Sequence, residues 1–355
     1  MTSLDSLEEI KKLDRGNVLG SIEHLGGQVE QAWKGIKELA IPEACSLAHN
    51  VIICGMGGSA LGGRIIKCLS SDRIRTPIEF YTDFHVPNYV NKNTLVILSS
   101  YSGNTQETLA AGKQALKRGA KIFGIATGGR LAEFLQKESL PGYIFEPHEN
   151  PSNQPRMGLG YSISAVLAVL SKCNFVSITD DEIHDALQTI NKFTKEFSSE
   201  VQEKDNLAKL TAKNLKGKIP VLIASEHLVG SAHAFKNQLN ENAKVFSVLF
   251  DIPELDHHLM EGLKNPAQAR QFYYFLFFES KLYDTEVIKR YPLTREVVEK
   301  NDIATGIYPL RSEKKLLQVF ELLAFGSFVS FYLSMLYGID PSPIPWVDYF
   351  KEKLK

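Results

Sequence analysis

A glycine-rich turn at residues 55–60 is the first part of the sequence that could bind a ligand. In the stretch VIICGMGGSALGGR, residues 51–64, Gly55, Gly57 and Ala60 fit the G-x-G-x-x-[GA] fingerprint of a dinucleotide-binding turn. Such a turn follows a strand and opens a helix, whose unpaired backbone N–H groups favour an anion. The pattern alone predicts a phosphate-binding turn, and it fits either a dinucleotide or a smaller phosphate.

A dinucleotide-binding enzyme is one interpretation of this turn. It requires an acidic residue about twenty residues further on to hold the ribose, and Glu79 and Asp83 lie at about that distance. A turn whose glycines serve only close packing is a second interpretation. Tight binding of NAD or NADP would favour the first.

Hydroxyl side chains after a later strand favour a small phosphate instead. In SSYSGNTQET, Ser100, Ser102 and Thr105 surround a glycine turn that opens a helix, and Ser59 occupies the corresponding point of the first turn. Neighbouring parallel strands present their carboxyl ends at one crevice, so the four hydroxyls can share one ligand. With the helix N-terminus they would form a phosphate cup that contains no lysine.

A purely structural explanation of the second turn needs no ligand. Asn104 and Glu107 have the spacing of a capping box, and the serines would then only complete the turn. A cap does not require three hydroxyl residues in S-x-S-x-x-T spacing, so we favour the phosphate cup. Gly57 and Gly58 of the first turn are included as substrate-binding positions.

Alternating strand and helix patterns position these turns. Strands are expected at residues 51–54, 78–81, 94–99, 121–126 and 143–145, and, after a polar helical passage, at 219–224, 244–250, 271–279 and 303–308. Helices are expected between them, at 59–69, 105–118, 129–138, 233–241 and 286–300. This rhythm predicts an α/β fold with two doubly wound, flavodoxin-like parallel sheets and helical additions at both ends.

The same pattern divides the chain into four parts. We expect an N-terminal helical segment at 1–45, a first α/β domain with the phosphate-binding turns at 46–178, a helical linker at 179–215 and a second α/β domain with C-terminal helices at 216–355. Residues 316–338 approach the length of a membrane span. Because Gln318 and Glu321 interrupt them, they are expected to form a buried helix.

The composition is that of a soluble globular protein. The chain has 355 residues, of which 44% are apolar, and its 40 basic and 41 acidic residues give a net charge of −1. This balance provides no overall field for nucleic acid or for an anionic membrane. It permits a small phosphorylated partner.

The cysteines and the N-terminus indicate a cytoplasmic protein. Cys45, Cys54, Cys68 and Cys173 form no C-x-x-C pair, and no second pair accompanies the spacing of Cys45 and His49, so we expect free thiols and no metal site. The first residues are acidic and lack an apolar core, which is not the pattern of a secretory signal.

Phrases spread from residue 54 to the C-terminus carry a family resemblance. They are CGMGGSALGG, SSYSGNTQET, QPRMGLGYS, KNQLNENAK, DIPELDHH and DPSPIPWVDYFKEKL. On them the sequence resembles sugar isomerase (SIS) domain proteins and, more narrowly, the bifunctional phosphoglucose/phosphomannose isomerase family. The resemblance implies SIS domains that interconvert glucose 6-phosphate, and mannose 6-phosphate, with fructose 6-phosphate through an enediolate. It implies no metal and no organic cofactor.

The resemblance also assigns roles to residues of these phrases. The four hydroxyl residues of the cup match the family's phosphate-binding positions. Glu241 matches the carboxylate base that moves the proton, and Arg156 matches the arginine that stabilises the enediolate charge. Ser342 falls near a position where the family often has threonine, a residue linked to the space that epimerisation at C2 of the sugar needs.

Ring opening is assigned to a histidine and a lysine. His257 matches the family's histidine, which crosses from the partner subunit, so the resemblance implies a homodimer with composite sites. This chain continues with His258 and Leu259 where the family usually has Asn-Glu, which keeps His258 as an alternative. Lys351 matches the lysine, and Lys353 would face another side of the same helix.

A non-catalytic, sugar-phosphate-binding regulatory SIS protein is the alternative from another class. The sequence has no evident helix-turn-helix appendage, and its set of acid–base candidates is complete. Both observations favour the enzyme.

Overall fold

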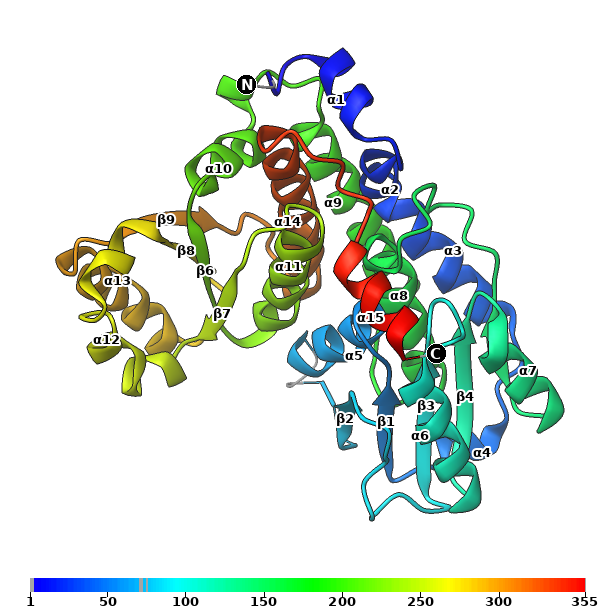
Figure 1. Cartoon of the computed structure of the whole chain (residues 1–355). Coiled ribbons are helices and arrows are strands. Elements are labelled where there is room, and N and C mark those ends of the chain that lie inside the picture. Colours follow the sequence, from blue (N-terminus) through cyan, green and yellow to red (C-terminus); the bar gives the residue numbers. More distant parts are fainter. Residues whose placement is uncertain (1–2, 70–72, 75, 355) are drawn as a thin grey trace.

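Two parallel β-sheets covered by helices form the framework of the computed structural model, which describes residues 3–69, 73–74 and 76–354 (Figure 1). The first sheet has the strand order β2-β1-β3-β4-β5, and each neighbouring pair is parallel. Its strands are β1 (Asn50–Cys54), β2 (Ile78–Tyr81), β3 (Thr94–Ser99), β4 (Lys121–Ala126) and β5 (Gly142–Ile144). The central strand β3 is buried throughout, as its apolar sequence TLVILS requires in a sheet with helices on both faces.

The second sheet repeats this arrangement without a fifth strand. Its order is β7-β6-β8-β9, again with parallel neighbours. The strands are β6 (Ile219–Ala224), β7 (Val248–Asp251), β8 (Tyr273–Glu279) and β9 (Ala304–Pro309). The predicted fold class is confirmed. Both sheets lie within the expected ranges 46–178 and 216–355, and those domain boundaries remain a prediction.

Two strands of the second sheet begin later than predicted. The strand expected from residue 244 begins at Val248, because Lys244 adopts a positive φ of 58° and the chain is still turning after the preceding helix. The strand expected from residue 271 begins at Tyr273, because Ala267–Phe272 forms a 3-10 helix.

Helices cover the sheet faces and both ends of the chain. In the N-terminal half they are α1 (Leu7–Leu13), α2 (Val18–Glu23), α3 (Leu25–Glu38), α4 (Glu43–Ser46), α5 (Gly58–Leu69), α6 (Gln106–Lys117), α7 (Gly129–Lys137), α8 (Leu159–Lys172) and α9 (Asp180–Phe197). In the C-terminal half they are α10 (Leu207–Leu215), α11 (Val229–Glu241), α12 (Leu259–Gly262), α13 (Thr285–Lys300), α14 (Lys315–Leu336) and α15 (Pro345–Lys353). A capping box formed by Thr179 and Glu182 begins α9, in agreement with its acidic first turn.

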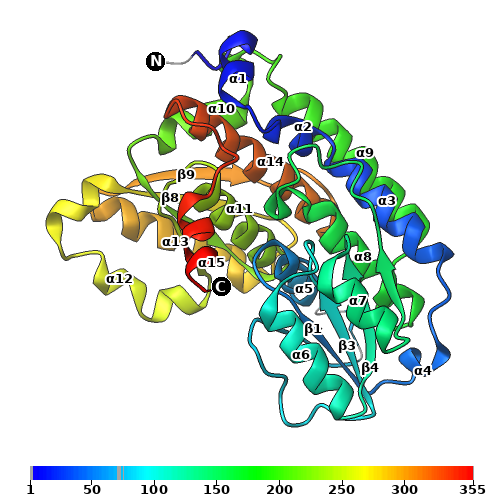
Figure 2. The ribbon, with the colours of Figure 1, turned by 45° about the vertical axis from the view of Figure 1, so that its right-hand side comes forward.

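The long apolar helix α14 lies between the two halves, next to α11 (Figures 1 and 2). Leu316 and Phe320 pack into the core around the first sheet, whereas Phe325 and Phe331 pack into the core around the second. Among the described residues α14 alone is long and apolar enough to cross a membrane, and 94% of its most apolar stretch is buried inside the protein. This confirms the expectation of a buried core helix.

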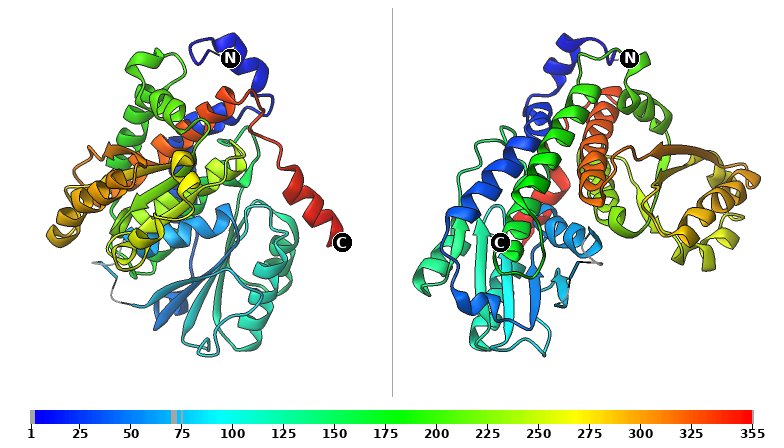
Figure 3. Two further views of the ribbon diagram at one scale, coloured as in Figure 1. Left: turned by 60° about the vertical axis from the view of Figure 1, so that its left-hand side comes forward. Right: turned by 180° about the vertical axis from the view of Figure 1, so that it is seen from behind.

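The C-terminal helix α15 stands away from the body of the molecule (Figure 3, left). Its residues are exposed throughout, and Trp346 and Phe350 expose 81% and 63% of their surface. Large apolar side chains on a solvated helix are uncommon unless another surface covers them.

Candidate active site

The two predicted ligand-binding turns lie side by side at one edge of the first sheet. They follow β1 and β3, which are neighbours at the point where the strand order of the first sheet reverses. Gly57 has a φ of 51°, in the left-handed region that favours glycine. At Gly58 a Cβ atom would lie 2.7 Å from the carbonyl oxygen of Pro155 and 3.2 Å from Cα of Arg156. The start of α5 is thus held against the segment that carries Arg156.

The hydroxyl residues of the cup are linked to one another. Ser59 is buried, and its Oγ accepts a hydrogen bond of 2.8 Å from the backbone N–H of Tyr101. The buried Ser100 donates from Oγ to Oγ1 of Thr105 at 2.9 Å. Ser102 lies on the exposed side of the turn. The structure therefore brings all four predicted hydroxyl residues into one small region at the N-termini of α5 and α6.

The capping box that the alternative explanation of the second turn required is not formed at the start of α6. Thr105 is the N-cap residue, and its side chain makes no capping hydrogen bond. Asn104 instead accepts from the backbone N–H of Arg130 and donates to the carbonyl of Ser102, so its amide joins two loops. No side chain of the described residues thus caps the N–H groups at the start of α6, and this is the arrangement that binds an anion.

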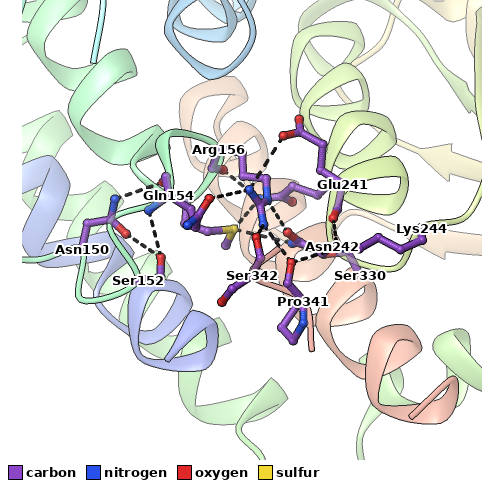
Figure 4. A network of polar contacts seen from close by, with 12 residues as sticks. Asn150, Ser152, Gln154, Arg156, Glu241, Asn242, Lys244, Ser330, Pro341 and Ser342 are labelled. Carbon is purple, nitrogen blue, oxygen red and sulfur yellow. Dashed lines mark hydrogen bonds and ion pairs between the residues drawn. The ribbon is translucent and has the colours of Figure 1, made fainter. Parts of the chain in front are cut away.

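A polar chain connects the cup to Arg156. Asn150 Nδ2 donates to the hydroxyl of Tyr101 at 2.7 Å. It also donates to the carbonyl of Gln154 at 3.1 Å (Figure 4). At Gly158 a Cβ atom would lie 2.7 Å from the Tyr101 ring, so the two segments are also in close van der Waals contact. A shift of either segment would move the other.

Arg156 is 3% exposed and is fixed by four hydrogen bonds (Figure 4). Nε donates to Asn242 Oδ1 at 2.7 Å and Nη1 to Gln154 Oε1 at 2.8 Å, while Nη2 donates to the carbonyls of Pro341 and Ser342, both at 2.8 Å. A guanidinium has five N–H donors. The bonds made among the described residues leave one donor, on Nη1.

Glu241 lies on the same side as that donor. It is the last residue of α11, and its Oε2 is 3.9 Å from Nη1 of Arg156. Burial raises the pKa of Glu241, and the charges of Arg156, Lys244 and Lys351 act in the opposite direction. A carboxylate with a raised pKa is a stronger base, and the adjacent guanidinium donor can stabilise an oxyanion.

The remaining predicted residues lie on separate segments. Ser342 reaches the site through its carbonyl group. Its buried Oγ has no hydrogen-bond partner among the described residues and lies against Gly16, where an added Cβ atom would be 1.7 Å away. Lys351 is exposed on α15 and acts on Glu241 through its charge. His257 is exposed at the end of the 3-10 helix Glu254–His257, and no hydrogen bond or ion pair in the described part of the chain joins it to Arg156.

Sequence reasoning missed the residues that hold Arg156 and Glu241 in place. Asn242 donates to Ser330 Oγ at 3.1 Å while it accepts from Arg156, and Gln154 accepts from the same guanidinium. Both lie inside or beside the quoted phrases KNQLNENAK and QPRMGLGYS, which was the available signal. Glu79, the predicted ribose ligand, already accepts hydrogen bonds from the hydroxyls of Tyr81 and Tyr89.

Comparisons with known proteins identify the family of this chain. The family model of the bacterial phospho-glucose isomerase C-terminal SIS domain matches residues 204–354. A bifunctional phosphoglucose/phosphomannose isomerase of Caldicellulosiruptor bescii is 33% identical over 340 residues, which are 94% of this chain and 98% of that protein. A second such isomerase, from Aquifex aeolicus, is 31% identical over 308 residues, which are 86% of this chain and 90% of that protein.

A solved structure shows the fold independently. The crystal structure of a hypothetical protein from Thermus thermophilus superposes with a TM-score of 0.73 over 98% of this chain and 93% of that one, at 15% identity. At this identity the likeness concerns the fold alone, whereas the sequence relatives extend over nearly the whole chain. The chain therefore belongs to the bifunctional phosphoglucose/phosphomannose isomerase family.

Proposed function

We propose that the protein is an aldose–ketose isomerase that interconverts glucose 6-phosphate and mannose 6-phosphate with fructose 6-phosphate. The observation that carries this proposal is the free Nη1 donor of Arg156 beside the carboxylate of Glu241, next to a lysine-free phosphate cup. The relatives' names supply the substrates, and the site supplies groups that suit the reaction.

The proposed reaction begins with the phosphate in the cup. Hydroxyl donors and the N-termini of α5 and α6 hold the dianion, which places the other end of the open-chain sugar toward Glu241. Glu241 takes the proton from C2 and returns it to C1, while the proton of the C2 hydroxyl passes to the C1 oxygen. Arg156 donates to the oxygen that becomes negative in the enediolate. Glucose and mannose differ only at C2, so both give the same enediolate.

A paired assay tests the proposal. The purified protein is supplied with each aldose phosphate in the presence of a chelator, and fructose 6-phosphate is measured. Formation from both substrates is expected. Binding of glucose 6-phosphate without turnover would favour the regulatory SIS protein, and tight binding of NAD or NADP would favour the dinucleotide enzyme.

Removing two hydroxyls of the cup tests how the phosphate is held. The double substitution Ser100→Ala and Ser102→Ala is expected to raise KM about 10²-fold with a smaller change in kcat, because hydrogen bonds to a charged group contribute about 1.5–3 kcal/mol each. Ser171→Ala is a matched control, since its hydroxyl donates to the Ile178 carbonyl on a different segment. An unchanged KM in the double variant would remove the phosphate cup from the proposal.

We infer that a second copy of the chain completes the site. Support comes from the separation of His257 from Arg156 and from the exposed apolar side chains of α15, which a partner could cover. We also infer a cytoplasmic location, because all four cysteine thiols are free, a state that the reducing cytoplasm maintains.

A mixed dimer tests whether His257 crosses between subunits. Differently tagged His257→Ala and Glu241→Gln chains are co-expressed, and the heterodimer is purified on both tags. About half of the wild-type activity is expected, because one site then has an intact Glu241 from one chain and an intact His257 from the other. A heterodimer as inactive as each parent dimer would place both residues in one chain's own site.

A further inference from the structure

Lys244 lies next to Glu241, and the proposed reaction assigns it no step. It follows the end of α11 by three residues, and its backbone has a φ of 58°, which is uncommon for residues other than glycine, asparagine and aspartate. In this conformation its Nζ donates to the carbonyl of Glu241 at 2.6 Å and to the carbonyl of Pro341 at 3.2 Å (Figure 4). The ammonium thus bridges the C-terminal end of α11 and a segment 97 residues further along the chain.

Two cationic side chains hold the turn at residues 340–342, called the Pro341 turn below. The carbonyl of Pro341 accepts from Lys244 and also from Nη2 of Arg156, and the turn is closed by Asp340, whose Oδ1 accepts from the backbone N–H of Ser342. The turn leads directly into α15, which carries Lys351. Because the side chains of α15 are exposed, its position depends on how this turn is anchored.

The charges around Lys244 connect it to Glu241. Loss of hydration and the Arg156 guanidinium lower the pKa of Lys244 to about 8, while Asp340 and Glu241 act in the opposite direction. The Lys244 ammonium in turn lowers the pKa of Glu241, as do Arg156 and Lys351. The protonation of Lys244 therefore affects the strength of the proposed base.

We propose that Lys244 is a positioning residue of the active site, whose ammonium ties the end of α11 with Glu241 to the Pro341 turn, from which the chain continues into α15 and Lys351. This inference rests on the proposed function. It extends that function to a side chain that contacts two backbone carbonyls and acts on the substrate only through its neighbours.

The test compares Lys244→Met and Lys244→Arg with a matched control. Lys172→Met removes a lysine whose Nζ also donates to backbone carbonyls, those of Ile36 and Lys37 at the end of α3, away from the site. Lys244→Met is expected to lower kcat about tenfold to a hundredfold, with KM within about twofold, and Lys244→Arg is expected to restore most of kcat. Lys172→Met should leave both constants unchanged.

Three readouts separate positioning from a general loss of stability. In Lys244→Met the acid limb of kcat/KM should move to higher pH, because a charge that favours the Glu241 carboxylate is gone. Backbone hydrogen exchange of residues 338–354 should become several-fold faster. The effects of Lys244→Met and Lys351→Met on kcat should be less than additive, since the first acts through the second.

The outcomes distinguish this inference from the function on which it rests. Wild-type protein that fails to isomerise either sugar phosphate would contradict the proposed function, and hydrogen exchange would still test the anchoring of α15. An active wild type together with a Lys244→Met variant of unchanged pH profile and unchanged exchange would overturn the role of Lys244, whatever its kcat.

Discussion

Replacing Glu241 with glutamine is expected to lower kcat by about 10²–10⁴-fold, the usual contribution of a positioned general base. Glutamine keeps the size of the side chain and removes its negative charge and its ability to take a proton. The Arg156 network contacts Asn242 and backbone carbonyls, so the variant should fold as the wild type does. The measurement is kcat with each aldose phosphate, together with proton exchange at C2 monitored by NMR in deuterium oxide.

Glu279→Gln provides the control. Its carboxylate pairs with Arg295 at 3.1 Å, and its side chain is 35% exposed against 31% for Glu241, so it loses a comparable ion pair outside the site. It should keep wild-type turnover. In the wild type, kcat/KM should fall as the pH drops through the raised pKa of Glu241, because the protonated carboxyl accepts no proton. Full turnover by Glu241→Gln would show that another group is the base.

Replacing Arg156 with methionine is expected to impair both catalysis and folding. The loss of the Nη1 donor beside Glu241 should lower kcat by about 10²–10³-fold, the range found for a single oxyanion donor. The variant also removes the guanidinium donor from Asn242 Oδ1 and from the carbonyls of Pro341 and Ser342, of which Pro341 keeps its bond from Lys244, and this should lower the free energy of unfolding by roughly 3–5 kcal/mol. Steady-state kinetics and urea unfolding measure the two effects.

The pH profile separates these two roles of Arg156. Its charge favours the ionised form of Glu241, so the acid limb of the methionine variant should lie at higher pH than in the wild type. Arg156→Lys keeps a charge and loses the planar fork that contacts four acceptors, and it should recover the pH profile more fully than the stability. A methionine variant with wild-type kcat would remove Arg156 from the chemistry.

The sequence predicted the parts of the fold that local pattern determines. Apolar runs such as Thr94–Ser99 between helical stretches are sufficient for a parallel sheet, and hydroxyl spacing after β3 located the cup. Where the chain turns before a strand, pattern was insufficient. Lys244 directly precedes an apolar run in the sequence and therefore falls within the expected strand. Its side chain instead donates to two backbone carbonyls at the end of α11 and in the Pro341 turn, and β7 begins only at Val248.

The support of the site was harder to predict for a physical reason. Arg156 is held by Asn242, Pro341 and Ser342, which lie 86 to 186 residues away, and two of its acceptors are backbone carbonyls. A carbonyl group carries no information about side-chain identity, so no motif marks it. The capping box that the spacing of Asn104 and Glu107 allowed does not form for a similar reason, because the Asn104 amide accepts a hydrogen bond from the backbone of Arg130.

The placement of α14 has a consequence for motion. One helix contributes side chains to both cores, so the halves of the molecule share a spine, and a movement of one half against the other would have to repack it. Arg156 comes from the first half and Glu241 from the end of α11 in the second, so this shared spine favours a constant distance between them while substrate enters and leaves. Flexibility during turnover then belongs to α15, which is joined to the spine only through the short Pro341 turn.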